Sequence, residues 1–292
     1  LVKAFHQVRI AAKDQMKTAV KTPWGVYFFK RLAMGLSNSA QTFQRVVEHA
    51  LEGVSGVFVY LDDLLIYSDE AGHEAKVEEV FQKLEEAGLS ISLKKCQFEK
   101  ESLEYLGYEV SQSGIRPLSR KIAAIQKLPV PKTQKQMLHY LGAINYFRAS
   151  LGNLPPDDAG TKARSAAEIL MPLYSLATCK IAKGTTFEEI WTNSPRTRKA
   201  YEDSKKLLTN AIVLNFPDPQ APLALTCDAS LSAMGAVLEQ HVDGCWRPLG
   251  CWSRSFKPDK QKWTSFRRET YAVQQALRYF HTDIAGRPCG SL

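Results

Sequence analysis

The sequence predicts a chain of the α+β class that is built from three successive parts. Over residues 1–115, short strand patterns alternate with amphipathic helical patterns, which favours a sheet with helices on one face. Residues 116–217 are mainly helical in pattern. Residues 218–292 return to alternating strand patterns that end in one long helix, which indicates the beginning of a further α/β unit.

The elements of the first part are bounded by turn and capping signals. Pro23-Trp24-Gly25 predicts a hairpin turn, and Asn38 or Ser37 is the expected N-cap of the helix that follows. In order, we expect an extended segment (2–10), the hairpin (17–32), a helix (37–54), strands Val57–Tyr60 and Leu64–Tyr67, a helix closed by Gly88 (73–89), and two strands (90–95 and 103–110).

The second and third parts are separated by a proline-rich stretch near Pro217–Pro222. Before it, helical spacing predicts helices over residues 117–128, 133–151 and 195–211. The less regular stretch 153–170 is expected to be a surface insertion. After it, the pattern predicts strands over residues 221–230, 232–240 and 246–256, followed by a helix over residues 266–282.

The composition is that of an ordinary globular protein, with 45% hydrophobic and 23% charged residues in 292 positions. The sequence has neither an apolar run of membrane-spanning length nor a signal-peptide pattern, so we expect no membrane partner and no secretion. None of the six cysteines forms a C-x-x-C pair, which favours reduced thiols in an intracellular protein over a zinc site.

The net charge of +8 is concentrated in the middle of the chain. Residues 116–210 carry 16 basic and 7 acidic side chains, a net charge of +9, whereas residues 1–115 carry 13 and 16, a net charge of −3. A basic segment of this kind indicates a polyanionic partner, most naturally a nucleic acid. The alternative is a solvated basic face that binds nothing.

Two adjacent carboxylates, Asp62 and Asp63, lie inside the apolar stretch GVFVYLDDLLIYSD (residues 56–69). One interpretation is a hairpin turn, since Asp tolerates turn geometry and bonds nearby backbone amides. The other is a site for a divalent cation, because Mg²⁺ takes oxygen ligands and is usually held by one or two carboxylates together with substrate phosphates.

The segment Tyr60-Leu61-Asp62-Asp63 resembles the Y-x-D-D box of reverse transcriptases, and its neighbours resemble gypsy-type retrotransposon polymerases in order and spacing. Nearly the whole chain takes part in this resemblance. The matching segments are LVKAFHQVRI (1–10), RLAMGLSNSAQTFQR (31–45), GLSISLKKCQF (88–98), LEYLGYEVSQSGI (103–115), LPVPKTQKQMLHYLGAINYFR (128–148), LTCDAS and GAVLEQ (225–240), and RRETYAV (267–273).

The resemblance implies an RNA-directed DNA polymerase with an associated RNase H, part of a retrotransposon Pol polyprotein. The implied parts are a polymerase palm (1–115), a thumb and connection (116–217) and the beginning of an RNase H-like domain (218–292). The implied cofactor is Mg²⁺ (or Mn²⁺), and the implied partners are an RNA template, a DNA primer, RNA–DNA hybrid and deoxynucleoside triphosphates (dNTPs). Protease and integrase would be neighbouring polyprotein segments, in cytoplasmic particles or the nucleus.

The resemblance also assigns roles to individual residues. Metal ligands of the polymerase would be Asp62 and Asp63, and those of the RNase H would be Asp228 and Glu269. The incoming nucleotide would meet Phe5, as a steric gate against a ribose 2′-hydroxyl, together with Gln7, Met34 and Gly35. Lys95 would protonate the leaving pyrophosphate, and Leu106-Gly107-Tyr108 would grip the primer. Without the motifs, Phe5 would be interpreted as a core residue and Lys95 as a solvated lysine.

The sequence differs from the family pattern in several respects. Two prolines expected near Ala33 and Ala40 are replaced, which predicts a less fixed loop before the helix. The stretch 155–167 has no family counterpart, and Thr282-Asp283 lies too early to be the RNase H T-D motif. The family's first catalytic Asp would precede Leu1, so we expect a fragment that is truncated at both ends and inactive alone. The alternative function is a non-catalytic relic that only binds nucleic acid.

Overall fold

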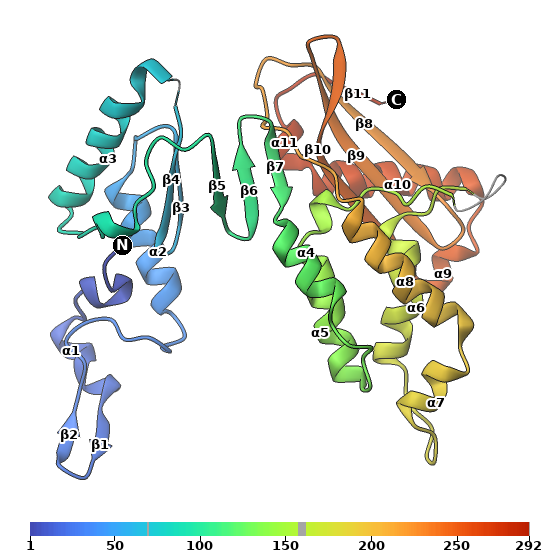
Figure 1. Cartoon of the computed structure of the whole chain (residues 1–292), viewed down its shortest axis with the longest axis horizontal. Helices are drawn as coiled ribbons and strands as arrows, with labels where there is room; N and C mark the ends of the chain where they lie inside the picture. The colour runs from blue at the N-terminus through green and yellow to red at the C-terminus, as the bar shows by residue number, and fades with distance from the viewer. Residues whose placement is uncertain (69, 157–161, 292) are drawn as a thin grey trace. The chain divides into compact units, whose positions relative to one another are not determined.

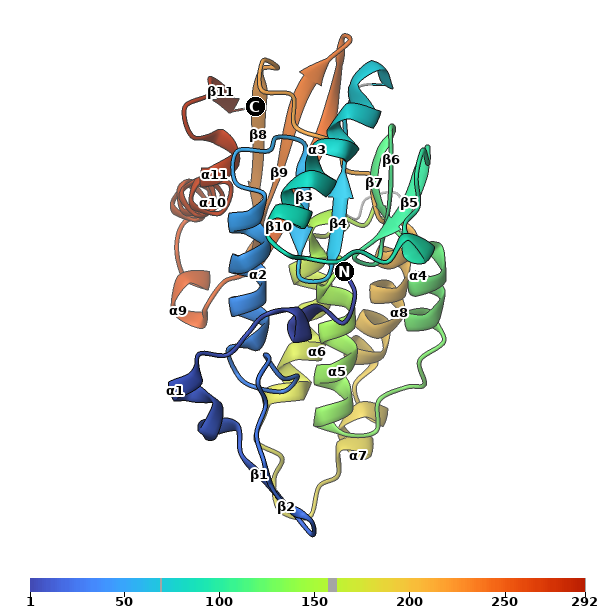
Figure 2. The same cartoon turned by 90° about the vertical axis from the view of Figure 1, so that its left-hand side faces the viewer.

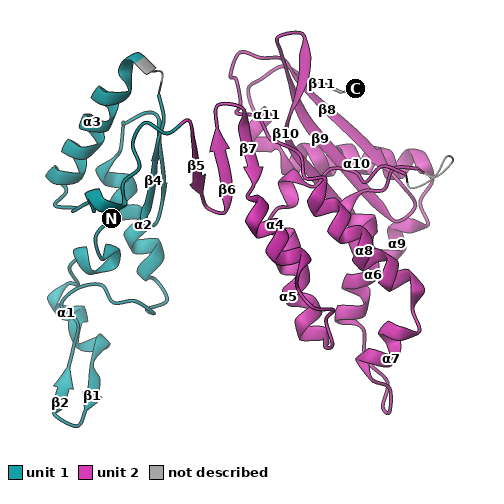
Figure 3. Ribbon diagram, viewed as in Figure 1, with its two compact units in different colours: residues 1–100 teal, residues 101–292 magenta. Residues whose placement is uncertain are grey.

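The computed structural model describes residues 1–68, 70–156 and 162–291, and these form two compact units. Unit 1 comprises residues 1–100 and unit 2 comprises residues 101–292 (Figure 3). The mixed helix and strand class predicted from the sequence is confirmed. The boundary between the two units lies at residue 100. The predicted boundaries of the three parts, at residues 115 and 217, stay predictions.

Unit 1 is made of short helices and two separate antiparallel hairpins, β1–β2 and β3–β4 (Figure 1). The expected turn at Pro23-Trp24-Gly25 is confirmed, since Thr22 pairs with Gly25. The elements are η1 (Ala4–Gln7), α1 (Ala12–Gln15), η2 (Met16–Thr18), β1 (Val20–Thr22), β2 (Gly25–Tyr27), α2 (Ser39–Ala50), β3 (Val57–Tyr60), β4 (Asp63–Ile66), η3 (Glu70–Gly72), α3 (His73–Glu86) and η4 (Leu93–Lys95).

The core of unit 1 lies between α2, α3 and the β3–β4 hairpin. Phe43 and Val47 of α2, and Val80 and Leu84 of α3, are fully buried. Each pair is separated by four residues and therefore projects from one face of its helix. Val57 and Val59 of β3 and Leu64 and Ile66 of β4 pack against this cluster, which seats the hairpin on the helices.

The expected strand over residues 90–95 is wrong, and the expected extended segment over residues 2–10 is only partly correct. Residues 2–10 contain the 3₁₀ turn η1, and residues 90–95 end in the 3₁₀ turn η4. The Gln7 side chain explains part of this difference, because its amide bonds both the N–H (2.6 Å) and the carbonyl oxygen (3.1 Å) of Ser90. These are the backbone groups that a strand partner would otherwise occupy.

Unit 2 begins with a three-stranded antiparallel sheet and continues into helices and a four-stranded sheet. The expected single strand over 103–110 is wrong, because the chain reverses at Leu106-Gly107. The elements are β5 (Ser102–Tyr105), β6 (Tyr108–Ser111), β7 (Gly114–Pro117), α4 (Ser119–Gln126), α5 (Gln134–Asn145), η5 (Arg148–Ser150), α6 (Ala166–Thr178), α7 (Phe187–Thr192), α8 (Pro195–Thr209), β8 (Leu223–Ala229), β9 (Ala233–Val242), β10 (Cys245–Ser255), α9 (Pro258–Gln261), α10 (Ser265–Tyr279), α11 (His281–Ile284) and β11 (Cys289–Ser291).

The helices α5, α6 and α8 run side by side and enclose a core of apolar residues (Figure 1, Figure 2). The expected surface insertion over 153–170 is only partly correct. Residues 157–161 lie outside the described residues, whereas the end of the stretch starts α6 and buries Ile169 and Leu170. The S-x-x-E pattern of Ser165–Glu168, which forms a capping box, marks this helix start in the sequence.

A buried ion pair connects the same stretch to α8. Asp203 is 1% exposed, and one of its carboxylate oxygens accepts a hydrogen bond from Arg164 at 2.8 Å. Such a pair specifies which segments meet, because a buried carboxylate left without its partner is costly.

The sheet of the C-terminal part has the order β10-β9-β8-β11, with β11 parallel to β8 and the other neighbours antiparallel. Helix α10 packs against β8 and β9 through Ala272 and Ala276, which are fully buried. The predicted strands and long helix of this part are confirmed, whereas β11 was not predicted. Among the residues that the structure describes, no helix is both long and apolar enough to cross a bilayer.

Candidate active site

The two adjacent carboxylates lie at the tip of the β3–β4 hairpin of unit 1. Asp63 belongs to strand β4 and pairs with Tyr60, so the expectation that both acids lie between the strands is wrong for Asp63. The turn itself is Leu61-Asp62, and Leu61 has a positive φ of 51°. Both aspartates are exposed. The hairpin therefore presents two neighbouring carboxylates to solvent from a turn and the first position of a strand.

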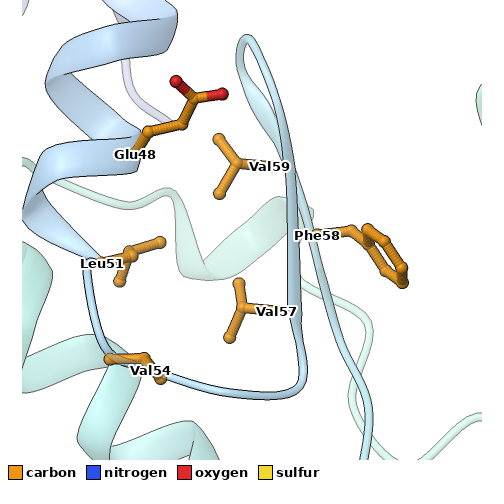
Figure 4. A pocket seen from close by; sticks show the side chains of 6 residues that line it. All are labelled: Glu48, Leu51, Val54, Val57, Phe58 and Val59. Carbon is orange, nitrogen blue, oxygen red and sulfur yellow. The ribbon is translucent and has the colours of Figure 1, made fainter. Parts of the chain in front are cut away.

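The strand register separates the acids from the core. Val57 and Val59 point toward α2, whereas Phe58 points away from it (Figure 4). Since side chains alternate along a strand and paired residues share a face, Asp63 and its partner Tyr60 lie on the same outer face as Phe58. The inner face packs the partly buried valines against the core, whereas Asp63 is exposed on the outer face and Asp62 is exposed at the turn.

Gln44 of α2 holds the turn from the inner side. Its side-chain Oε1 accepts a hydrogen bond from the N–H of Leu61 at 2.6 Å, and its Nε2 donates to the carbonyl oxygen of Val59 at 2.9 Å. The same Nε2 lies 2.8 Å from Oε1 of Glu48, one helical turn away. One amide thus binds the backbone on two sides of Tyr60, next to Asp62. Sequence reasoning gave Gln44 no role, although it stands in the matched T-F-Q segment.

Gly56 closes the open end of the same hairpin. Its φ is +75°, and a Cβ built on it would lie 2.5 Å from the carbonyl oxygen of Tyr67. The Tyr67 N–H donates to the Gly56 carbonyl oxygen at 2.9 Å. Only glycine combines this backbone conformation with so close an approach. The hairpin is therefore fixed at both of its ends.

A shallow open cleft of about 300 Å³ lies between α2 and β3. Its lining consists of Glu48, Leu51, Val54, Val57, Phe58 and Val59 (Figure 4). Neither aspartate lines the cleft, and its single carboxylate, Glu48, is already bonded to Gln44. The cleft is therefore separate from the carboxylates at the hairpin tip.

The side chains of two expected nucleotide contacts, Phe5 and Gln7, already make contacts within unit 1. Phe5 is half-buried and packs edge-on against Phe43 of α2, with ring centroids 5.5 Å apart. The amide of Gln7 bonds the backbone of Ser90, as described above, and also donates to the Val2 carbonyl oxygen at 2.5 Å. Phe5 is thus held on the helix that also positions the hairpin. The amide of Gln7 is occupied by backbone groups.

The loop that carries Met34 and Gly35 is bonded at its helix end by Ser39, and the expectation that the replaced prolines leave it less fixed stays a prediction. Ser39 is buried, and its hydroxyl donates to the Ala33 carbonyl oxygen at 2.6 Å. Its N–H also bonds the Leu36 carbonyl oxygen. Met34 is 66% exposed, and Gly35 has φ +87°, with no atom within 4 Å of the point that a Cβ would occupy. Both residues are therefore open to a ligand.

Lys95 lies at the end of η4 and is exposed. Its backbone N–H bonds the carbonyl oxygen of Ser92. The structure thus presents this ammonium group to solvent from a short 3₁₀ turn, and its expected role as a proton donor stays a prediction.

The donor set of the hairpin fits a magnesium ion. Two exposed carboxylates supply hard oxygen ligands, and Mg²⁺ typically completes its octahedron with water and substrate phosphates. Within residues 1–68, 70–156 and 162–291, no cluster of three or more His, Cys, Asp or Glu side chains is arranged to hold a metal. Asp62 and Asp63 alone are therefore expected to bind the ion weakly.

The second pair of expected metal ligands lies in unit 2. Asp228 is exposed near the end of β8, and Glu269 is exposed on α10, the helix that packs against β8. Oδ1 of Asp228 accepts the N–H of Ala229 at 2.9 Å, and Oε1 of Glu269 accepts from the Ser265 hydroxyl at 3.2 Å. The two carboxylates thus lie on elements that pack against each other, and their expected role as metal ligands stays a prediction. Thr282-Asp283, which lies too early for the T-D motif, belongs to α11.

The comparisons with known proteins agree with these two parts. The family described as reverse transcriptase (RNA-dependent DNA polymerase) matches residues 1–110, and the RNase H-like domain found in reverse transcriptase matches residues 191–289. Similar curated proteins include the Pol polyproteins of the Drosophila melanogaster transposons gypsy (32% identity) and 297 (31%), each over 98% of this chain. The chain spans 27% and 25% of their lengths, about a quarter.

Solved structures of similar fold are foamy viral protease–reverse transcriptases. One, in complex with double-stranded DNA, is 26% identical and covers the whole of this chain and 48% of its own, with a TM-score of 0.82. Another, in complex with RNA/DNA hybrid, is 26% identical, with a TM-score of 0.79, and 37% of its own chain is covered. The Y-x-D-D hairpin, the two matched domains and these relatives together show that the chain belongs to the reverse transcriptases of gypsy-type retrotransposon Pol polyproteins, with an RNase H-like domain following the polymerase segment.

Proposed function

We propose that this chain supplies the metal-binding carboxylates and the primer–template contacts of RNA-templated DNA synthesis. The observation that carries the proposal is the exposed Asp62–Asp63 pair on a hairpin whose turn is bonded to α2 through Gln44. Nucleotide addition is an in-line phosphoryl transfer that depends mainly on positioning and charge neutralisation. A stiff hairpin that carries two carboxylates suits this requirement.

The polymerase carboxylates would act by holding Mg²⁺ against the reacting phosphate. When bound, Mg²⁺ neutralises charge on the phosphate oxygens and orients the attacking and leaving groups. Asp62 and Asp63 would be ligands of this ion, and Gln44 would keep the turn in place. The N-terminal amine of Leu1 donates to the Asp62 carbonyl oxygen at 3.0 Å, so any residue joined to Leu1 in a polyprotein would lie beside Asp62.

The nucleotide contacts are proposed from the same part of unit 1. Phe5 would exclude a ribose 2′-hydroxyl with a ring that Phe43 supports, and Met34 and Gly35 would line the dNTP. Lys95 would donate the proton to pyrophosphate. Gln7 would act on the nucleotide indirectly, because its amide holds the segment that carries Phe5 next to the backbone of Ser90. In unit 2, Asp228 and Glu269 would hold Mg²⁺ or Mn²⁺ for cleavage of RNA in RNA–DNA hybrid.

The context of these activities is proposed from the family. Protease and integrase segments would belong to the same polyprotein, and synthesis would take place in cytoplasmic particles or the nucleus, where template RNA and dNTPs are present. A non-catalytic nucleic-acid-binding function is the alternative, and it shares the basic helices of unit 2 with the enzyme.

Duplex binding by the 292-residue chain tests the nucleic-acid part of the proposal. Residues 116–210 have a net charge of +9, and exposed basic residues include Lys121, Lys127, Lys132 and Lys135 on or beside α4 and α5. We expect the chain to bind a primer–template duplex, with log affinity falling linearly with log salt concentration. The slope should be about 0.9 per phosphate neutralised on B-form DNA.

The assay is fluorescence anisotropy of a labelled duplex over a series of salt concentrations. The test variant is the double substitution Lys132→Gln, Lys135→Gln. Its slope of log affinity against log salt concentration should be smaller than that of the unaltered chain by up to about 2 if both lysines contact phosphates. An affinity that does not respond to salt, or no binding at low salt, would show that the basic segment is a solvated face.

A further inference from the structure

The turn between β5 and β6 is a half-buried two-residue hairpin turn that places a leucine in the left-handed region. Leu106 and Gly107 both have positive φ, 49° and 79°, and the pair Tyr105–Tyr108 closes the hairpin. The resemblance assigns this turn to the primer, so any role of the turn in primer binding rests on the proposed function. A two-residue turn that holds a nucleic-acid backbone must itself be fixed by its surroundings.

The side chain of Tyr146, at the C-terminal end of α5, lies against this turn. Its hydroxyl donates a hydrogen bond to the Leu106 carbonyl oxygen, and its Cε1 would lie 3.4 Å from a Cβ built on Gly107. Tyr108 returns the interaction, since its hydroxyl donates to the Tyr146 carbonyl oxygen at 3.0 Å. The two rings stack with centroids 5.9 Å apart at 29°. We call these two residues the tyrosine clamp.

The tyrosine clamp is anchored in the helical core. Phe147 is 2% exposed and meets the rings of Tyr108 and Tyr146 edge-on, at 5.4 Å and 5.0 Å. Burial, together with the neighbouring Tyr146, raises the pKa of Tyr108 to about 12, so its hydroxyl remains a neutral donor at physiological pH. The turn is therefore tied to the C-terminal end of α5 by two reciprocal hydrogen bonds and by the contacts of the Tyr108 ring with Tyr146 and Phe147.

The clamp also changes the electrostatics of the turn. The Gly107 carbonyl oxygen accepts the N–H of Leu118 at 3.3 Å, and the Leu106 carbonyl oxygen accepts the Tyr146 hydroxyl. A carbonyl oxygen that faces a phosphate repels it, whereas one bonded to a donor has its negative end partly offset. Tyr146 remains 55% exposed, so a ligand can still reach the clamp from the solvent side.

We propose that Tyr146 is a positioning residue for the primer strand, whose hydroxyl fixes the Leu106-Gly107 turn and offsets its carbonyl charge so that the turn binds a phosphodiester near the primer 3′ end. The ligand is a phosphodiester linkage of duplex DNA or hybrid. The clamp acts through the turn, and Tyr146 itself performs no chemistry.

A double-mutant cycle between protein and DNA tests this proposal with the 292-residue chain. The protein variant is Tyr146→Phe, which removes the hydroxyl and keeps the ring. The DNA variants carry one neutral methylphosphonate at each of the last four primer linkages in turn. We expect Tyr146→Phe to weaken binding of the native duplex about 3- to 10-fold, the range for losing one hydrogen bond. The loss should shrink or vanish for one or two particular methylphosphonate positions.

The matched control is Tyr140→Phe. The Tyr140 hydroxyl is bonded to Ser204 at 2.8 Å in the buried core of the same unit, so this variant should lose stability without losing affinity. Thermal unfolding of each variant shows that binding is measured on folded protein. Tyr108→Phe, which removes the reciprocal bond, should repeat the position-dependent coupling.

The possible outcomes separate this proposal from the proposed function. Coupling at particular linkages supports the positioning role. An equal loss on every duplex, or no loss at all, overturns it while leaving duplex binding intact. If the unaltered chain binds no duplex at low salt, the proposed function fails first, and the clamp is then only a structural contact.

Discussion

Replacing Asp62 with Asn is expected to lower DNA synthesis by about 10³-fold or more, because the substitution removes a charged metal ligand from the reacting centre. The side chain is exposed at the turn of a hairpin that Gln44 and Gly56 hold at its two ends, so the backbone should keep its position. The loss should therefore appear in the rate of nucleotide addition and leave binding of the duplex nearly unchanged.

The assay uses a longer protein, because the chain spans 27% of the gypsy Pol polyprotein that it resembles. A suitable one is the gypsy Pol reverse transcriptase in which residues 1–292 of this chain replace the aligned segment, since the two align over 290 residues. Single-turnover primer extension with Mg²⁺ reports the chemical step. Asp259→Asn, in the short helix α9 of unit 2, is the matched control and should retain full activity. Extension by the Asp62→Asn protein at a rate close to that of the unsubstituted chimera would refute the assignment of this site.

Gln44→Met should also impair synthesis strongly, although Gln44 reaches only backbone and Glu48. Methionine keeps the length of the side chain and favours helix, but it cannot bond the Leu61 N–H or the Val59 carbonyl oxygen. A displacement of about 1 Å at a reacting centre can cost about 100-fold in rate. We therefore expect a 10- to about 100-fold fall in the rate of nucleotide addition at saturating dNTP.

The control for this substitution is Gln82→Met on α3. The Gln82 amide donates to Glu86 of its own helix at 3.2 Å, so the same exchange there breaks no contact with the hairpin. Amide spectra of the 292-residue chain supply a second readout, since the Leu61 N–H signal should move in Gln44→Met and stay in Gln82→Met. Unchanged rate and unchanged Leu61 signal together would mean that the turn does not depend on Gln44.

Local patterns predicted the elements that place the candidate site, and distant contacts decided the rest. The helix α2 and the strands β3 and β4 follow from helical spacing and alternation over a few residues, so sequence alone was sufficient for them. Residues 90–95 alternate like a strand, but Gln7, some 83 positions away, occupies the backbone of Ser90. No pattern near residue 90 contains that information.

The same division applies to the residues of the site. Asp62 and Asp63 were found from a motif, whereas the importance of Gln44 appears only when α2 is folded against the hairpin. Tyr146 is similar, because the turn that it contacts lies 40 positions earlier in the chain. The start of α6 was missed although its capping box is local, since the preceding prolines and aspartates suggested a loop.

The central claim is that Asp62 and Asp63 form a site for a divalent metal, and paramagnetic broadening by Mn²⁺ measures it directly. Amide spectra of the isotope-labelled 292-residue chain would be recorded while Mn²⁺ is added in small amounts, followed by excess Mg²⁺. We predict that signals of Tyr60–Leu64 broaden first, recover with Mg²⁺, and stay sharp in the double variant Asp62→Asn, Asp63→Asn. Broadening that begins instead along the acidic helix α3, with Tyr60–Leu64 unaffected or equally affected in the double variant, would contradict the claim.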